Sequence, residues 1–328
     1  MANTPAMSAT NFCLGSGEAA LPGVSMRGAR YSRNLKQPSE GSIGIAGAGR
    51  VAQALGRLLL EAGEPVVCVA SRDLHRARAA AKFIGPGVEA FVYADVPGGI
   101  SRWLVAVADR GLTEVATVLS KHTGISIAIH PSGASGPEVL APLRERGVAC
   151  GTLHPLQTVV EGPAGVAALR GAAFAILGDP EATAWAEQIA VLAGGEILRI
   201  PSELRPLYHA AAIMASNYVI ALADAAQTLM ECVGVEKSAA LRALAPIMRA
   251  AVENAVTRGP VAALTGPIER GDIKTVESHL KALSSAPERI QRLYRAAGLQ
   301  TIDVAQRRGL SAAVALDLEK TLLSRRGD

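Results

Sequence analysis

Apolar and polar positions alternate regularly between residues 42 and 200. Short apolar runs at 42–46 and 66–70 predict two strands, and the apolar residues between them, at 51–59, recur at the spacing of an amphipathic helix. Further strand candidates, most of them separated by helical patterns, lie at 104–107, 125–129, 149–153, 174–177 and 197–200. Such alternation is typical of a doubly wound α/β sheet, in which helices connect parallel strands.

Beyond residue 200 the strand signal disappears. Helical spacing continues through a long apolar segment from 203 to about 233, a second at 237–256 and a last one at 310–324. Pro246 lies inside the second segment and is expected to kink or end that helix. We therefore expect a disordered leader at 1–40, an α/β domain at 41–200 and an all-α domain at 201–328. Three arginines in the leader leave a transit peptide as an alternative for that segment.

Composition excludes several classes of protein. The 33 Lys and Arg against 29 Asp and Glu leave a formal charge of +4 without a basic run, and aromatic residues are only 3%, so no nucleic-acid partner is expected. The most apolar stretch, 210–223, is interrupted by Ser216 and Asn217, so no membrane span is expected. The four cysteines form no C-x-x-C pair, which argues against a metal site and fits the reducing cytoplasm.

A glycine turn follows the first predicted strand. The segment from Gly47 through Gly49, Arg50 and Val51 to Ala52 matches the G-x-G-x-x-G/A pattern between a strand and an amphipathic helix. The first glycine permits a tight turn, the second lets a pyrophosphate approach the backbone, and the small sixth residue lets the helix pack on the strand. The N–H groups at the helix start would then hold the phosphates, which predicts dinucleotide binding.

The residues after the second strand indicate which dinucleotide is bound. An NAD site usually places an acidic residue there for the ribose diol, whereas this chain has Ser71 and Arg72. A hydroxyl and a planar guanidinium suit the 2′-phosphate of NADP, so NADP(H) is the expected cofactor. The neighbouring Asp73 is the feature that argues for NAD.

Two histidines follow later strands of the predicted sheet. His130 begins the segment that contains Ser132, and His154 follows the strand at 149–153. The carboxyl ends of such strands face the cofactor crevice, where a neutral imidazole can exchange a hydrogen bond with a hydroxyl or a carbonyl. We expect His154 to contact nicotinamide or substrate, with a structural histidine as the alternative, and His130 to be structural.

The first long helix of the all-α part carries a polar stripe. At about 100° per residue, Ser216 falls about 20° to one side of His209 and Asn217 about 80° to the other. Such a stripe either lines a cleft between the domains or forms a buried network that tethers helices. Further along, residues 265–272 predict a turn with Pro267 at a first helical position, in which Arg270 and Thr265 could bind a carboxylate.

These segments together resemble one family. The glycine turn, the His-x-Ser-Gly-Ala at 130–134, the Leu-His-Pro-Leu-Gln-Thr at 153–158, the segment at 208–218 and the turn at 265–272 resemble the Rossmann-like plus DUF2520 group of NADP-dependent oxidoreductases. That group is similar to the 6-phosphogluconate dehydrogenase-like superfamily. The resemblance implies a Rossmann domain at 41–200, a helical DUF2520-like domain for substrate binding and dimerisation at 201–328, and a homodimer.

The resemblance also suggests a reaction. Some members of the group are implicated as ketopantoate reductases, and Ser132 with His154 resembles the serine and histidine of prephenate and arogenate dehydrogenases. The chain departs from related patterns at Pro131, where the family has threonine, and it keeps Asn217 without the lysine that hydroxyacid dehydrogenases place on the same helix. Proton donation would then fall to His154, to His209 or to water.

We therefore predict an NADPH-dependent reductase of a small carbonyl acid, with ketopantoate as the leading candidate. His154, His209, Asn217 and Ser132 are the predicted catalytic residues. Arg270, Ser216 and Thr265 are predicted to bind substrate, and the residues predicted to bind the cofactor are Gly47, Gly49, Arg50, Val51, Ser71 and Arg72. An imine reductase, a prephenate-like dehydrogenase and a non-catalytic NADP sensor or scaffold are the alternatives.

Overall fold

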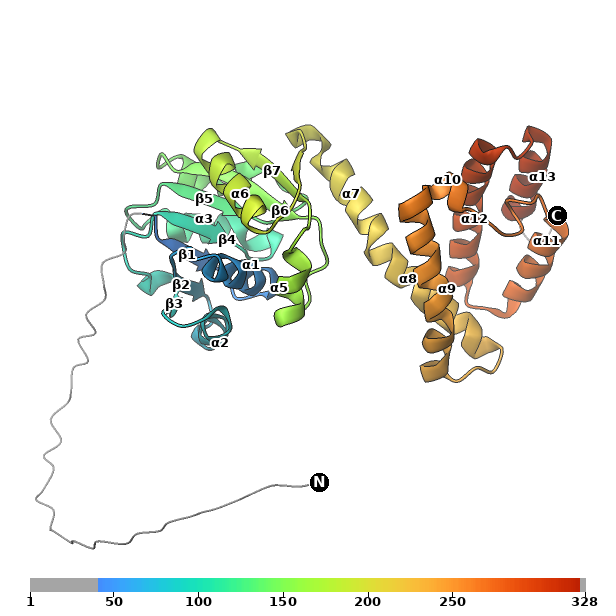
Figure 1. The fold of residues 1–328 in the computed structure, drawn as a ribbon, viewed down its shortest axis with the longest axis horizontal. Helices are drawn as coiled ribbons and strands as arrows, with labels where there is room; N and C mark the ends of the chain where they lie inside the picture. The colour runs from blue at the N-terminus through green and yellow to red at the C-terminus, as the bar shows by residue number, and fades with distance from the viewer. Residues whose placement is uncertain (1–40, 325–328) are drawn as a thin grey trace, which may run out of the picture. The chain divides into compact units, whose positions relative to one another are not determined.

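The computed structural model describes residues 41–324, so the predicted leader lies outside the described residues. An eight-stranded sheet has the order β3-β2-β1-β4-β5-β6-β7-β8 (Figure 1). Its strands are β1 (Ile43–Ala46), β2 (Val66–Ser71), β3 (Glu89–Val92), β4 (Arg102–Val105), β5 (Ile127–His130), β6 (Ala149–Pro155), β7 (Phe174–Gly178) and β8 (Ile197–Arg199).

Helices cover both faces of this sheet, as a doubly wound fold requires. One core packs the apolar sides of α1 (Arg50–Glu61), α2 (Leu74–Ile84), α5 (Pro163–Leu169) and α6 (Pro180–Leu192) onto the sheet. A second core packs α3 (Leu112–Leu119) and α4 (Ala141–Arg144), with the intervening 3₁₀ turn at Pro137–Leu140, against the opposite face. The predicted α/β class is confirmed.

The rest of the described chain is helical. It consists of α7 (Arg205–Ala215), α8 (Asn217–Cys232), α9 (Lys237–Arg258), α10 (Pro260–Ala263), α11 (Ile273–Ala282), α12 (Glu288–Arg308) and α13 (Ala312–Leu323). A separate small core contains Ile268, Val276, Ile302, Leu318 and Leu322. The last strand, β8, ends at Arg199, and every later element of the described chain is a helix.

Two features of the sheet differ from the sequence expectation. β3 was not predicted, because all four residues of this edge strand are only half-buried and give no clear apolar run. β7 runs antiparallel to β6, whereas every other neighbouring pair is parallel. Alternation of strands and helices does not specify the direction of a strand, so the sequence could not reveal this reversal.

The long helix expected from 203 to about 233 is broken in two at Ser216. The Ser216 hydroxyl donates a hydrogen bond to the Ala212 carbonyl at 2.6 Å, and its backbone angles leave the helical region at φ −124° and ψ −75°. Back-bonding of a serine to the carbonyl four residues earlier bends helices. By contrast, α9 continues through Pro246, which therefore does not end that helix.

Helices α7, α8 and α9 bury very little of their surface. Arg205 and Ala240 are their only buried residues within the described chain. Ser202–Cys232 is also long and apolar enough to span a membrane by length and composition, at a mean hydropathy of 1.2 with none of its apolar window buried. The exposed apolar surface of these helices therefore suits contact either with lipid or with a protein partner.

Candidate functional site

The glycine turn lies at the carboxyl end of β1. Gly47 has φ +121°, and a Cβ at this position would lie 2.1 Å from the Ala106 carbonyl oxygen, just beyond β4. Both the backbone angle and the close approach of the neighbouring chain exclude any larger residue. The turn therefore needs glycine at its first position, as the motif predicts.

The second glycine leaves space for a ligand. Gly49 caps the N-terminus of α1, no side chain caps that terminus, and a Cβ on Gly49 would meet nothing within 4 Å. Arg50 is exposed and Val51 half-buried, and the first turn of α1 contains no acidic residue. Free N–H groups, a positive helix end and open space are the features that a pyrophosphate requires, so these residues fit a dinucleotide.

The end of β2 carries Ser71 and Arg72. Ser71 is buried, and its hydroxyl accepts a hydrogen bond from the Asp73 N–H. The Asp73 carboxylate accepts from the N–H groups of His75 and Arg76, so it caps α2. Arg72 is exposed, forms no ion pair within residues 41–324, and lies close enough to Tyr93 for its charge to oppose the burial that raises the pKa of that phenol. The acidic residue that argued for NAD thus has a structural role.

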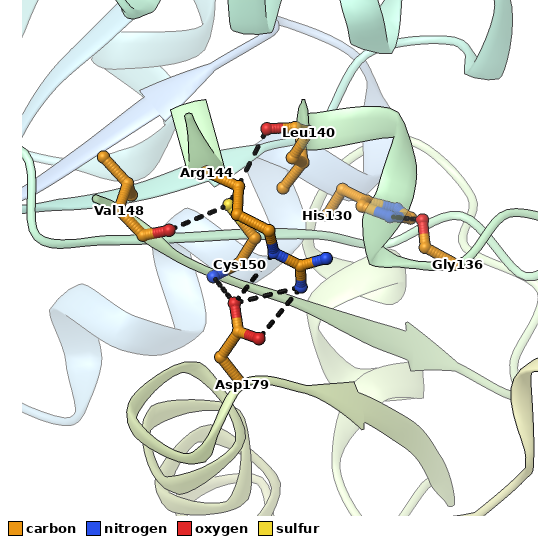
Figure 2. Close-up of polar contacts among 7 residues, drawn as sticks. All are labelled: His130, Gly136, Leu140, Arg144, Val148, Cys150 and Asp179. Carbon is orange, nitrogen blue, oxygen red and sulfur yellow. Dashed lines mark hydrogen bonds and ion pairs between the residues drawn. The ribbon is translucent and has the colours of Figure 1, made fainter. Parts of the chain in front are cut away.

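The loop after β5 is held by His130. This histidine is fully buried; its Nδ1 accepts from the Ser132 N–H at 3.2 Å, and its Nε2 lies 2.9 Å from the Gly136 carbonyl oxygen (Figure 2). These partners require the proton on Nε2, and burial lowers the pKa of His130 to about 4. His130 is therefore a neutral structural residue that shapes the loop, in agreement with the sequence interpretation.

A second anchor lies beside this loop. The Asp179 carboxylate, at the N-terminus of α6, pairs with Arg144 at 3.0 Å and accepts from the Cys150 N–H at 2.8 Å (Figure 2). The Cys150 thiol is buried and donates to the carbonyls of Leu140 and Val148, and burial raises its pKa to about 11. A thiol held in this way is unreactive, and no group of metal-ligating side chains occurs within residues 41–324.

His154 and His209 meet at the carboxyl ends of β5 and β6. A Cβ on Gly133 would lie 2.5 Å from His209 Nδ1 and 2.7 Å from His154 Nε2, so both nitrogens face the same point of the loop after β5. The two rings are edge to face with centroids 5.9 Å apart. On its other side, His154 Nδ1 lies 2.8 Å from the Tyr208 hydroxyl.

The surroundings of His154 hold its imidazole neutral at pH 7. Burial, followed by the charges of His209 and Arg205, lowers its pKa to about 4. His209 Nδ1 is buried and has no hydrogen-bond partner within the described residues. A buried polar atom without a partner carries a desolvation cost, which a hydrogen bond from a ligand would remove.

The structure brings together only part of the predicted site. His154 and His209 converge at Gly133, and the neighbouring Ser132 accepts a hydrogen bond from the Ser135 N–H at 3.2 Å through its hydroxyl. Ser216 and Asn217 bond to each other at the helix break, where Asn217 is exposed. The regular polar stripe drawn from His209 to Asn217 is therefore wrong, because it assumed an unbroken helix.

The predicted carboxylate-binding turn also differs from the sequence expectation. Residues 266–271 form a turn, but α11 starts only at Ile273, so Pro267 is not at a first helical position. Arg270 and Thr265 are exposed in this turn, and neither has a hydrogen bond to the histidine cluster in the described chain.

Two residues of the cluster received no role in the sequence analysis. Tyr208 contacts His154, and Arg205 donates to the Ser132 carbonyl oxygen at 2.8 Å and to the Thr152 hydroxyl at 3.3 Å. The signal was available in their spacing: Arg205 precedes Tyr208 by three residues and His209 by four, which places all three on one face of a helix.

Comparisons with known proteins agree with this architecture. Residues 26–155 match the model of a Rossmann-like domain, and residues 172–301 match the domain of unknown function DUF2520. The chain belongs to the Rossmann-like and DUF2520 family. No curated protein matches the sequence.

Solved structures share the fold at low sequence identity. A Bacteroides fragilis protein assigned as an NADP oxidoreductase is 22% identical with a TM-score of 0.65, over 81% of this chain and 98% of that chain. A Thermotoga maritima protein is 22% identical with a TM-score of 0.67, over 80% and 99%. The Plasmodium falciparum pyrroline carboxylate reductase with NADP bound is 11% identical with a TM-score of 0.53, over 85% and 98%.

The convergence on Gly133 can be tested by adding one methyl group. Gly133→Ala places a Cβ where the two imidazole nitrogens lie, so we expect both rings to move and the His154–Tyr208 contact to be lost. The measurement is the imidazole NMR signals of His154 and His209. Gly98→Ala is the matched control, because its Cβ meets only the Thr123 hydroxyl at 3.6 Å. Equal spectra for the two variants would contradict the described geometry.

Proposed function

We propose that this protein is an NADPH-dependent oxidoreductase that reduces a small 2-oxo acid, with ketopantoate as the leading candidate. The observation that carries the proposal is the convergence of His154 Nε2 and His209 Nδ1 at Gly133, at the same edge of the sheet as the glycine turn. In open α/β sheets, ligands bind outside the carboxyl ends of the strands. The likeness to proteins named as NADP oxidoreductases and reductases supports the reaction class.

The residues around His154 suggest how a carbonyl is held during reduction. A nicotinamide, when bound, would supply hydride to the carbonyl carbon, and the carbonyl oxygen would then carry negative charge. If the Tyr208 hydroxyl donates to His154 Nδ1, then Nε2 carries the imidazole proton and donates a hydrogen bond to that oxygen. As the Nε2 proton passes to the alkoxide, the Tyr208 proton passes to Nδ1, so the imidazole stays neutral and the negative charge moves to Tyr208. The Arg205 charge stabilises this phenolate, and water returns its proton before the next turnover.

His209 supplies the second nitrogen of this arrangement. Its unpartnered Nδ1 faces the same point as His154 Nε2, so it can donate to or accept from the same substrate group. The exposed Arg270 and Thr265 are proposed to bind the carboxylate, and Ser132, Ser216 and Asn217 to complete the substrate site. The Ser132 hydroxyl accepts from the Ser135 N–H, and in this scheme its own O–H donates to the carbonyl oxygen of the substrate.

The reaction is tested by NADPH consumption with ketopantoate, together with other 2-oxo acids, cyclic imines and prephenate. We expect turnover with ketopantoate, and a loss of about 100- to 10,000-fold for His154→Ala, because that is the usual contribution of a proton donor. His209→Ala tests, in the same assay, whether His209 Nδ1 contributes to turnover. If only the imines are turned over, the substrate is an imine and not a 2-oxo acid. Tight NADPH binding without consumption of any compound would instead identify a cofactor sensor or scaffold.

The cofactor preference is tested separately at Arg72. Removal of a guanidinium from a 2′-phosphate costs about 1.5–3 kcal/mol, so Arg72→Ala should weaken NADPH binding by about 10- to 100-fold and leave NADH binding unchanged. Fluorescence titration of both cofactors measures this. Arg78→Ala is a suitable control, because Arg78 is an exposed arginine inside helix α2, whereas Arg72 precedes that helix at the end of β2. An unchanged NADPH-to-NADH ratio would contradict the role of Arg72.

We also propose that the active form is a homodimer associated through α7, α8 and α9. The apolar residues Leu207, Met214, Ile220, Ile247 and Val256 are each more than 60% exposed. Lipid is a poor occupant of this surface, since a spanning helix would place the Ser216 break, Asn217 and Asp224 in the bilayer. A second copy of this chain would cover the same apolar residues without placing these polar groups in a bilayer.

Sedimentation at several concentrations tests the assembly. We expect a dimer that Ile247→Glu converts to a monomer, whereas Leu323→Glu, on the exposed side of α13, leaves it intact. A monomeric wild-type chain, or binding of that chain to phosphatidylglycerol vesicles, would contradict the dimer.

A further inference from the structure

Arg205 is a buried cation at the start of α7. Only 1% of its surface is exposed, although arginine is among the residues that proteins bury least often. Its two terminal nitrogens donate to the Ser132 carbonyl oxygen, in the loop after β5, and to the Thr152 hydroxyl, in β6. One planar group thus connects α7 to two separate segments of the sheet.

No carboxylate of residues 41–324 forms an ion pair with this cation. Its Nε is buried without a hydrogen-bond partner within the same residues. Glu138, the acidic residue whose charge acts on it, accepts from the Gly136 N–H. A buried charge held only by neutral acceptors is costly, so simple tethering of a helix is a poor explanation for an arginine here.

The spacing of α7 shows what Arg205 positions. Tyr208 and His209 follow it by three and four residues, so they lie one turn further along the same face. Tyr208 contacts His154 Nδ1, and His209 Nδ1 lies against Gly133, in the loop whose Ser132 carbonyl Arg205 holds. Because the guanidinium is held in place, α7 is fixed in its axial position and its rotation. The positions of Tyr208 and His209 relative to His154 follow from this.

We propose that Arg205 is a positioning residue that docks α7 onto β6 and the loop after β5, and whose unpaired charge acts on His154. The inference rests on the proposed function only where it assigns His154 a part in the reaction. The docking of α7 by Arg205 and the effect of its charge on His154 do not depend on which reaction is catalysed.

The electrostatic part depends on all the groups that face His154. These are His209, Tyr208 and Arg205 from α7, His130 from β5, and Asp109 from the 3₁₀ turn at Asp109–Gly111. Burial lowers the pKa of His154 most, and the charges of His209 and Arg205 lower it further, while Asp109 alone among these raises it. Loss of the Arg205 charge should therefore move the pKa of His154 upward, from about 4 toward 6.5.

Two substitutions separate the charge from the hydrogen bonds. Arg205→Lys keeps the charge but cannot donate in the planar fork, whereas Arg205→Gln keeps donor groups without the charge. NMR titration of the His154 imidazole in the full chain measures the pKa without any turnover. We expect an upward shift in Arg205→Gln and a value near that of the wild type in Arg205→Lys. Arg170→Gln, at an exposed arginine paired with Glu61, is the control.

Turnover provides the second readout. Both variants disturb the docking of α7, so kcat with the accepted substrate should fall by about 100-fold, as expected when reacting groups are misplaced by an ångström. NADPH affinity should not change. The acid limb of the pH profile should move to higher pH only in Arg205→Gln, because a raised pKa protonates His154 earlier as pH falls.

The proposal would be overturned by equal shifts of the His154 pKa in both variants, or by none in either. If neither variant folds, Thr152→Val removes one acceptor and keeps the cation, and it should loosen the His154–Tyr208 contact without raising the pKa; an unaltered contact would overturn the docking role. Absence of turnover in the wild-type chain would refute the proposed reaction, whereas the NMR titration would still decide the role of Arg205.

Discussion

The candidate site depends on the docking of one helix onto the carboxyl ends of two neighbouring parallel strands. Arg205, Tyr208 and His209 project from one face of α7, and each contacts β6 or the loop after β5. The contacts of Arg205 and Tyr208 are hydrogen bonds and are mostly buried, so they are directional in a way that apolar packing is not. His209 instead lies against Gly133, and its Nδ1 has no hydrogen-bond partner within the described residues. A small rotation of α7 would break all three at once, and His154 would lose its neighbours on that side.

The strand ends are themselves held firmly. His130 uses both ring nitrogens to fix the loop that contains Ser132 and Gly133, and Asp179 ties α6 to Arg144 and to the backbone of β6. Such preorganisation is what a site needs if its groups are to act without rearrangement. The same principle operates at the glycine turn, where the close approach of Ala106 fixes Gly47 and leaves Gly49 facing open space.

Much of the fold could be predicted from the sequence, because alternating apolar runs and helical spacing are local signals. The strands at 43–46, 66–71 and 149–155 and the class change near 200 are of this kind. The antiparallel β7 and the break at Ser216 were missed, since strand direction and a serine hydrogen bond to a preceding carbonyl leave no trace in hydrophobic periodicity.

The candidate site was predictable in part for the same reason. His154 and His209 were recognisable as polar residues in apolar surroundings, but their convergence on Gly133 is a tertiary contact between residues far apart in the chain. Arg205 was overlooked because an arginine at the start of a helix is normally exposed, and only the folded chain shows that its guanidinium enters the strand ends.

The cap at the start of α2 links the stability of the fold to the strand end at which we propose that the cofactor binds. Asp73 directly follows Arg72, and its carboxylate holds the first N–H groups of that helix. Asp73→Ala would remove the cap and destabilise α2 by about 1 kcal/mol. Asparagine and serine would remove the negative charge next to Arg72 and still cap the helix, so they are the replacements that this position tolerates best.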